Sequence, residues 1–181
     1  MTLECIDVCN YIINSVNEHN YGRVLKEQVL LSTKRLQKIL FFSNVLYMVE
    51  NNGTPMFEDE FSTYPSGPVI PTVYRKFMMY QDGPMHPSLE SNNIVSPEIK
   101  DVLDRVLEAT KGIDTSALIQ KSLEQGSPCW EVWKEMPYEE GPVIDNKLIY
   151  TYYLMHSVPY GVKNKPLLKD KIFSRASREV E

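Results

Sequence analysis

The sequence predicts a mainly α fold, a compact single-domain bundle of about six to seven helices with one small β-hairpin or strand near residues 57–66. Three observations favour this class. Apolar residues recur every three to four positions in several segments, as they do on one face of a helix. Serine, aspartate, proline and glycine stand where they begin or stop helices. Hydrophobic residues make up 43% of the 181 residues, which is enough to form a core.

The N-terminal third contains two expected helices. The first covers residues 3–17 and carries one apolar stripe. The second covers residues 33–50, where Ser32 or Thr33 caps the start and Gly53 supplies the stop. Its apolar surface is wider than a single stripe, so we expect this helix to be central and packed on more than one side.

The stretch YPSGPVIPTVYRKF, at residues 64–77, predicts a rigid turn from a short strand into a helix. Gly67 can adopt a positive φ that other residues resist, and Pro68 then fixes the direction of the chain. Pro71 suits the first position of a helix, where no amide hydrogen is needed. We expect this helix to end near Gln81.

Further helices are expected after Ser96, Asp114 and Asp145, each of which can cap a helix. A short helical segment between the last two carries Trp130 and Trp133. The tetrapeptide GPVI occurs twice, but no repeat of fixed length links the copies, so we interpret the second copy as a coincidence.

The charge divides the chain into residues 1–156, the expected helical domain, and residues 157–181, a basic tail interrupted by prolines. The tail carries six basic and three acidic residues, a net charge of +3, and the whole chain has −5, which leaves −8 for the domain. This acidic balance argues against nucleic acid as a partner, because binding along phosphates needs clustered positive charge. The tail is interpreted as a solvated extension or as a segment that orders on a partner.

Three cysteines without a CxxC pair indicate reduced thiols and a cytoplasmic protein. Cys5 and Cys9 would share one helix face as small apolar residues. The first ten residues lack a cationic leader followed by an apolar region, so no signal peptide is expected. No apolar stretch reaches about 18 residues, so no membrane span is expected.

No motif for catalysis or for a cofactor is present, so we expect no enzyme, no catalytic residue, no cofactor and no metal. The sequence lacks GxxxxGK[ST], GxGxxG, GxSxG and HExxH. The acidic run Glu58, Asp59 and Glu60 could hold a divalent metal, but a solvated turn is the simpler interpretation. Cys129 has no visible base beside it and is interpreted as a small buried residue.

Three segments in order resemble the Panacea-domain family, the phage-associated GepA-like and SocA-like antitoxin proteins. These are STKRLQKILFFSNVLYMVENNGTPMFEDEF, then STYPSGPVIPTVYRKF, and later SPCWEVW before a tyrosine-rich helix. The resemblance covers roughly residues 5–155 and is most specific over 32–77. The residues that match the family motif and are expected to be structural are Leu36, Leu40, Phe42, Phe57, Gly67, Pro68 and Pro71.

The resemblance implies a protein that binds and neutralises a cognate toxin encoded by an adjacent gene. One branch of the family resembles a proteolysis adaptor, so the alternative is an adaptor for an ATP-dependent protease, or a host-interaction module without its own toxin. The candidate partner-binding residues are Lys38, Tyr64, Tyr74 and Trp130. Trp130 and Trp133 can be interface residues or core residues, and the sequence leaves both open.

Overall fold

The computed structural model describes residues 3–80, 84–90, 93–135, 141–156 and 158–159. These residues form seven α-helices, one 3-10 turn and one two-stranded antiparallel sheet, which confirms the predicted mainly α class. All but two residues of the tail predicted over 157–181 lie outside the described residues, so the domain boundary stays a prediction. In chain order the elements are α1 (Cys5–Asn20), η1 (Leu25–Glu27), α2 (Thr33–Glu50), β1 (Ser62–Tyr64), β2 (Gly67–Val69), α3 (Pro71–Phe77), α4 (Pro97–Thr110), α5 (Thr115–Ser122), α6 (Pro128–Trp133) and α7 (Asn146–Met155).

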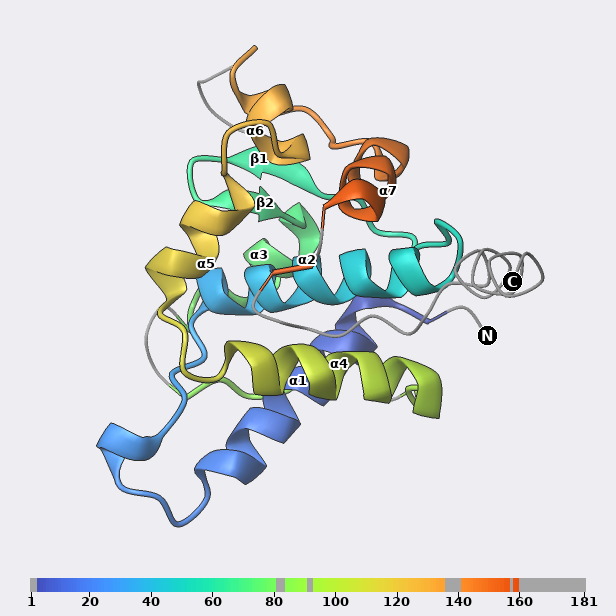
Figure 1. Ribbon diagram of the computed structural model, residues 1–181. Helices are drawn as coiled ribbons and strands as arrows, with labels where there is room; N and C mark the ends of the chain where they lie inside the picture. Colours follow the sequence, from blue (N-terminus) through green and yellow to red (C-terminus); the bar gives the residue numbers. More distant parts are fainter. Residues whose placement is uncertain (1–2, 81–83, 91–92, 136–140, 157, 160–181) are drawn as a thin grey trace, which may run out of the picture.

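Helix α2 is the centre of the fold. It crosses the middle of Figure 1, with α1 and α4 on one side and the hairpin, α6 and α7 on the other. It contacts α1, α3, α4, α5, α7 and strand β2. Fifteen of its 18 residues are buried, and Ser32 caps its start by accepting a hydrogen bond from the Arg35 amide. A helix surrounded in this way must be apolar on nearly all sides, as the sequence predicted.

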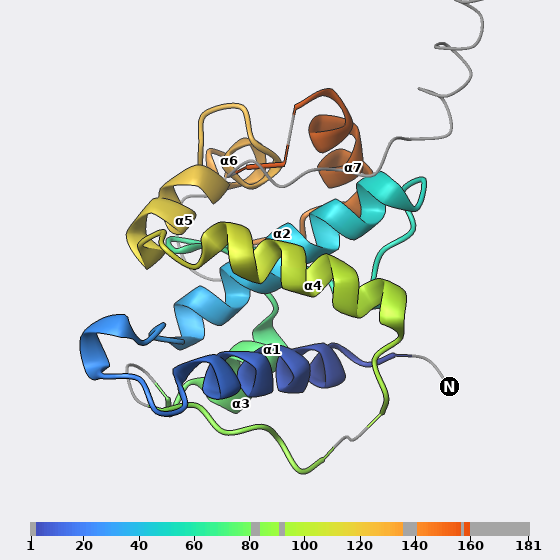
Figure 2. The same ribbon diagram turned by 60° about the horizontal axis from the view of Figure 1, so that its bottom comes forward.

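Helices α1 and α4 form the layer that Figure 2 brings forward. The chain that approaches α4 is held to α1 by side-chain amides. Asn10 exchanges two hydrogen bonds with the backbone of Ser88, at 2.9 and 2.7 Å, and Asn17 donates to the Met85 carbonyl at 3.0 Å. These bonds satisfy backbone groups that no regular structure satisfies in this connection.

Two predicted helix ends were wrong. Helix α1 continues from the predicted end at residue 17 to Asn20. The chain leaves the helical conformation at Tyr21, with ψ of 126°, and turns at Gly22, with φ of 72°. Helix α3 ends at Phe77 and not near Gln81. The Phe77 carbonyl accepts from the Tyr80 amide at 3.0 Å and from the Thr33 hydroxyl at 2.8 Å, so a tight turn and a tertiary bond take the place of the next helical turn.

Strand β1 has a hydrogen-bonded neighbour on each side, although only one of these neighbours, β2, is a strand. Strand β1 pairs with β2 so that Thr63 lies opposite Pro68. This is a non-hydrogen-bonded pair of the ladder, so both Thr63 backbone groups point to the other neighbour, accepting from the Gly141 amide at 2.9 Å and donating to the Pro142 carbonyl at 3.2 Å, and a proline is tolerated at position 68. The two GPVI segments, 67–70 and 141–144, therefore lie on opposite edges of β1.

The three cysteines are free and buried, as the sequence predicted. Cys5 and Cys9 lie on α1 and face the core, where both are almost fully enclosed. None of the helices formed by the described residues is both long enough and apolar enough to span a membrane.

Candidate functional site

The candidate partner surface is the hairpin surface, which we define as Tyr64, Tyr74 and Trp130. Tyr64 ends β1 and Tyr74 lies on α3, and the turn between them brings the two rings to 6.3 Å between centroids. Tyr74 is 37% exposed, and Tyr64 is half-buried. An aromatic pair on a short rigid turn presents contact area without losing much conformational freedom on binding.

Trp130 joins the hairpin surface through α6, which contacts both strands. Ser127 caps this helix by accepting a hydrogen bond from the Trp130 amide. Trp130 is half-buried, and the Lys134 ammonium lies 4.8 Å from its ring centroid. The neighbouring Cys129 is fully buried and hydrogen-bonds the backbone of Tyr64, which ties α6 to the end of β1.

Lys38 lies beneath the hairpin surface and not on it. Its side chain is fully buried, and its ammonium nitrogen donates to the Pro68 carbonyl at 2.6 Å. Gln37, the residue before it, exchanges two hydrogen bonds with Ile70, at 2.9 and 3.3 Å. In this fold Lys38 supports β2 from α2, and direct contact with a partner would require the hairpin to lift.

Burial shifts the pKa values of Lys38 and of Cys129. Desolvation lowers the pKa of Lys38 to about 7, against a weaker opposing effect of Cys129. Desolvation raises the pKa of Cys129 to about 12, although the charge of Lys38 and the hydrogen bond from Tyr64 act in the other direction. Cys129 is therefore a thiol at neutral pH, and its nucleophilicity is suppressed.

The residues of the family motif lie in the core or in the turn. Gly67 has φ of 87°, and a Cβ atom there would be 2.3 Å from the Ser122 hydroxyl oxygen. Pro71 begins α3, as predicted. Leu36, Leu40, Phe42, Phe57, Gly67 and Pro68 are buried, and Pro71 is half-buried.

The sequence did not identify Gln37 and Lys38 as a linked pair that holds the hairpin. The feature that could have identified them is their position: two adjacent polar residues lie between Leu36 and Ile39. Leu36 and Ile39 belong to the buried stripe. Two consecutive polar side chains on a helix that is apolar all round indicate buried hydrogen bonds. Nothing in the local pattern indicates which backbone groups they would reach.

The acidic run does not form a metal site with other described residues. Asp59 accepts a hydrogen bond from the Thr72 hydroxyl at 3.3 Å. Within the described parts of the chain, no three histidine, cysteine, aspartate or glutamate side chains gather in a way that could hold a metal ion.

The fold and the hairpin surface define a small helical domain whose core is closed around one central helix and whose aromatic turn is displayed on a rigid support. The comparison with protein families gives the class a name: residues 36–131 match the Antitoxin SocA-like, Panacea domain family. The match spans most of α2, the hairpin, α3, α4, α5 and most of α6. The chain belongs to this family. No curated protein and no solved structure matches it.

Proposed function

We propose that the protein neutralises a toxin encoded by an adjacent gene by binding it directly and stoichiometrically, without turnover. The observation that carries the proposal is the family match, which is to an antitoxin-like domain and includes the whole hairpin surface. The charge of −8 on residues 1–156 also supports it, because an acidic body attracts a basic partner and raises the rate of encounter. The cytoplasm is the compartment that the free thiols favour.

The proposed contact uses the aromatic rings of the hairpin surface as anchors. Tyrosine and tryptophan dominate many interfaces because a large ring, held in place, excludes water from its contact. The buried bonds from Gln37 and Lys38 keep the turn in one conformation before binding. Less order is then lost when the partner docks, which increases affinity.

Co-expression tests the proposal. The adjacent small reading frame should arrest growth when it is expressed alone, and co-expression of this protein should restore growth. The two proteins should also co-purify at a fixed ratio. If the neighbour is harmless, or if growth is not restored, the proposal is wrong.

The same experiment separates neutralisation from the adaptor alternative. Under neutralisation, the toxin remains present and bound in rescued cells. Under the adaptor alternative, the toxin disappears, and it reappears together with growth arrest when the ATP-dependent proteases are deleted.

Changes on the hairpin surface should weaken the partner complex. We expect Tyr74→Ala combined with Trp130→Ala to raise the dissociation constant by at least tenfold, since truncating each anchoring ring typically costs more than about 1 kcal/mol. The matched control is Tyr21→Ala, because Tyr21 is 90% exposed on the distant loop after α1. Calorimetry on the purified pair measures both effects. Equal affinities for the double variant and the control would show that the interface does not include the hairpin surface.

A further inference from the structure

The segment that joins α1 to α2 projects from one end of the molecule. We call its residues 21–30 the tip loop. In Figures 1 and 2 the tip loop extends beyond the helices beside it, at the end of the molecule away from α6 and α7. Residues 21–27 are all exposed. The tip loop therefore offers its side chains to any surface that approaches this end of the protein.

The side chains offered by the tip loop are mostly apolar. Among the described residues, thirteen large apolar side chains are exposed, and four of them lie in this short loop. They are Tyr21 at 90% exposure, Leu25 at 81%, Leu30 at 69% and Val24 at 55%. Single apolar side chains on a surface are ordinary, but several on one projection indicate a binding surface.

Hydrogen bonds hold the tip loop in this conformation. At its base the Asn20 side chain accepts from the Val29 amide at 2.8 Å and donates to the Val29 carbonyl at 2.9 Å. Arg23 donates to the His19 carbonyl at 2.6 Å, and Gln28 donates to the Arg23 carbonyl at 2.8 Å. Polar side chains thus close the loop from within, while the apolar ones stay outside. A surface held in place in this way loses less order on binding.

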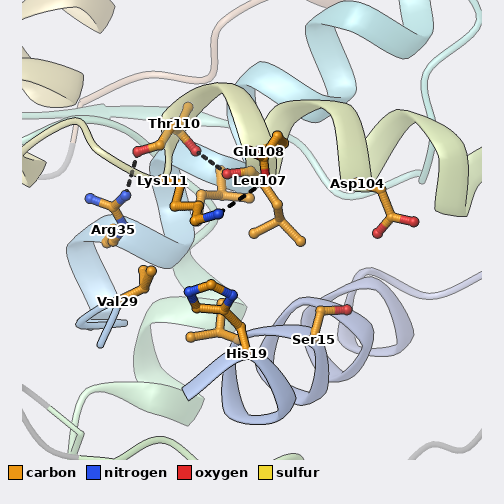
Figure 3. A pocket seen from close by; sticks show the side chains of 11 residues that line it. Ser15, His19, Val29, Arg35, Asp104, Leu107, Glu108, Thr110 and Lys111 are labelled. Carbon is orange, nitrogen blue, oxygen red and sulfur yellow. Dashed lines mark hydrogen bonds and ion pairs between the residues drawn. The ribbon is translucent and has the colours of Figure 1, made fainter. Parts of the chain in front are cut away.

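The body of the protein offers no shelter to these side chains. Figure 3 shows the place where the base of the tip loop meets the body, with His19 and Val29 beside a cavity of about 270 Å³ between α1 and α4. Of the ten residues of the tip loop, Val29 alone lines this cavity. The side chains of Val24 and Leu25 can therefore leave water only by contact with something outside the protein.

The tip loop and the turn that follows it are basic, although the protein is acidic. Residues 21–34 carry Arg23, Lys26 and Lys34 against Glu27, a net charge of +2, and the whole chain has −5, which leaves −7 for the other residues. All four of these charged side chains are exposed. Exposed charges are largely screened beyond about 8 Å at physiological ionic strength. A surface that touches the projecting tip is therefore affected more by these cations than by distant acidic residues.

We propose that the tip loop docks on the surface of a membrane that contains anionic lipids. Val24 and Leu25 enter the boundary between headgroups and acyl chains, and Tyr21 lies among the headgroups. Arg23 and Lys26 contact the lipid phosphates. A lipid surface is favoured over a protein because seven consecutive exposed residues share no flat face. A protein would need a pocket shaped around the projection, whereas lipids rearrange around it.

Vesicle flotation with the full-length chain tests the proposal. Vesicles of phosphatidylcholine with about one-third phosphatidylglycerol should bind the protein at least tenfold more tightly than vesicles of phosphatidylcholine alone, since each basic residue at an anionic surface contributes about fivefold. Leu25→Glu should weaken binding at least tenfold, because a charge replaces an apolar side chain in the lipid. Lys26→Ala should weaken it about fivefold, and only on the anionic vesicles. Leu89→Glu is the matched control, since Leu89 is 91% exposed but lies before α4, and it should have little effect.

A fluorescent label shows whether the tip loop itself enters the lipid. The three native cysteines are buried, so Val24→Cys adds one accessible thiol for a dye that responds to its environment. On anionic vesicles its emission should shift to shorter wavelength, and lipids brominated in their acyl chains should quench it. The same dye on Leu89→Cys should keep the emission that it has in water.

Three outcomes would overturn the proposal. The first is no binding at millimolar lipid, which would leave a protein as the partner of the tip loop. The second is an equal loss of binding for Leu25→Glu and Leu89→Glu. The third is a label at position 24 that stays in water while the protein floats with the vesicles, which would assign the contact to the basic residues of 157–181. Toxin binding is measured without lipid, so this test and that of the proposed antitoxin function do not depend on each other.

Discussion

Gly67→Ala is expected to destabilise the domain by about 3 kcal/mol. A residue with a side chain at φ of 87° costs roughly 1–2 kcal/mol. The new Cβ would also lie 2.3 Å from the Ser122 oxygen and 3.2 Å from Lys38 Cε and Nζ, and such overpacking costs roughly another 1–3 kcal/mol. Urea denaturation monitored by circular dichroism measures the difference.

The chain offers controls that separate the two costs. Gly22 has φ of 72° but nothing within 4 Å of a Cβ, so Gly22→Ala should show the backbone cost alone. Gly112 has neither a positive φ nor a neighbour, so Gly112→Ala should be neutral or slightly stabilising. Adding Ser122→Ala to Gly67→Ala should recover part of the loss. Equal stabilities for the Gly67 and Gly22 variants would show that the hairpin does not pack on α5 and α2 as described.

Patterns that depend on neighbouring residues were predictable from the sequence. The central helix, its Ser32 cap and its burial on several sides follow from apolar residues spread around the whole helix. The turn at Gly67 and the start of α3 at Pro71 follow from the backbone preferences of those two residue types. Most of the segment that local rules predicted best also lies within the family match.

Features that depend on distant residues were not predictable in the same way. The early end of α3 depends on Thr33, which lies 44 residues away in sequence. The third segment at β1 depends on Gly141 and Pro142. The burial of Arg35 depends on the carbonyls of Thr110 and Ile113, which lie 75 and 78 residues away. No local pattern contains these partners, and long polar side chains such as Arg35 are normally exposed.

The burial of Lys38 has a cause in the register of the hairpin. In the pairing of β1 with β2, Thr63 and Pro68 form a non-hydrogen-bonded pair, so the Thr63 backbone bonds the 141–144 segment and the Pro68 carbonyl points away from β1. The Pro68 carbonyl is buried and needs a donor from elsewhere. Lys38 supplies it from α2 at 2.6 Å. A long side chain is needed to span helix and hairpin, and the result is an ammonium enclosed by the core.

The stability of the protein should therefore rise with pH between 7 and 9. The pKa of Lys38 is about 7 in the folded state and near 10.5 in the unfolded chain, so the unfolded chain binds more protons in this range. Raising the pH then favours the folded state, by about 2 kcal/mol between pH 7 and 9. The raised pKa values of Cys5 and Cys129 act from about pH 8 upward, where they reduce stability because the unfolded thiols ionise first, so they offset part of the gain from Lys38 as the pH approaches 9.

Lys38→Met isolates this effect, because methionine fills similar space without a titratable group. Its free energy of unfolding, measured in urea at several pH values, should be nearly constant from pH 7 to 8 and should then fall slightly toward pH 9, as the unfolded thiols ionise. The Pro68 carbonyl loses its donor, which costs about 1–3 kcal/mol, but the variant no longer buries an amine, so it should match or exceed the wild type at pH 7. Lys147→Met, on the exposed first turn of α7, should keep the wild-type slope. A Lys38→Met protein with the same slope as the wild type would mean that Lys38 keeps an ordinary pKa and is hydrated in solution.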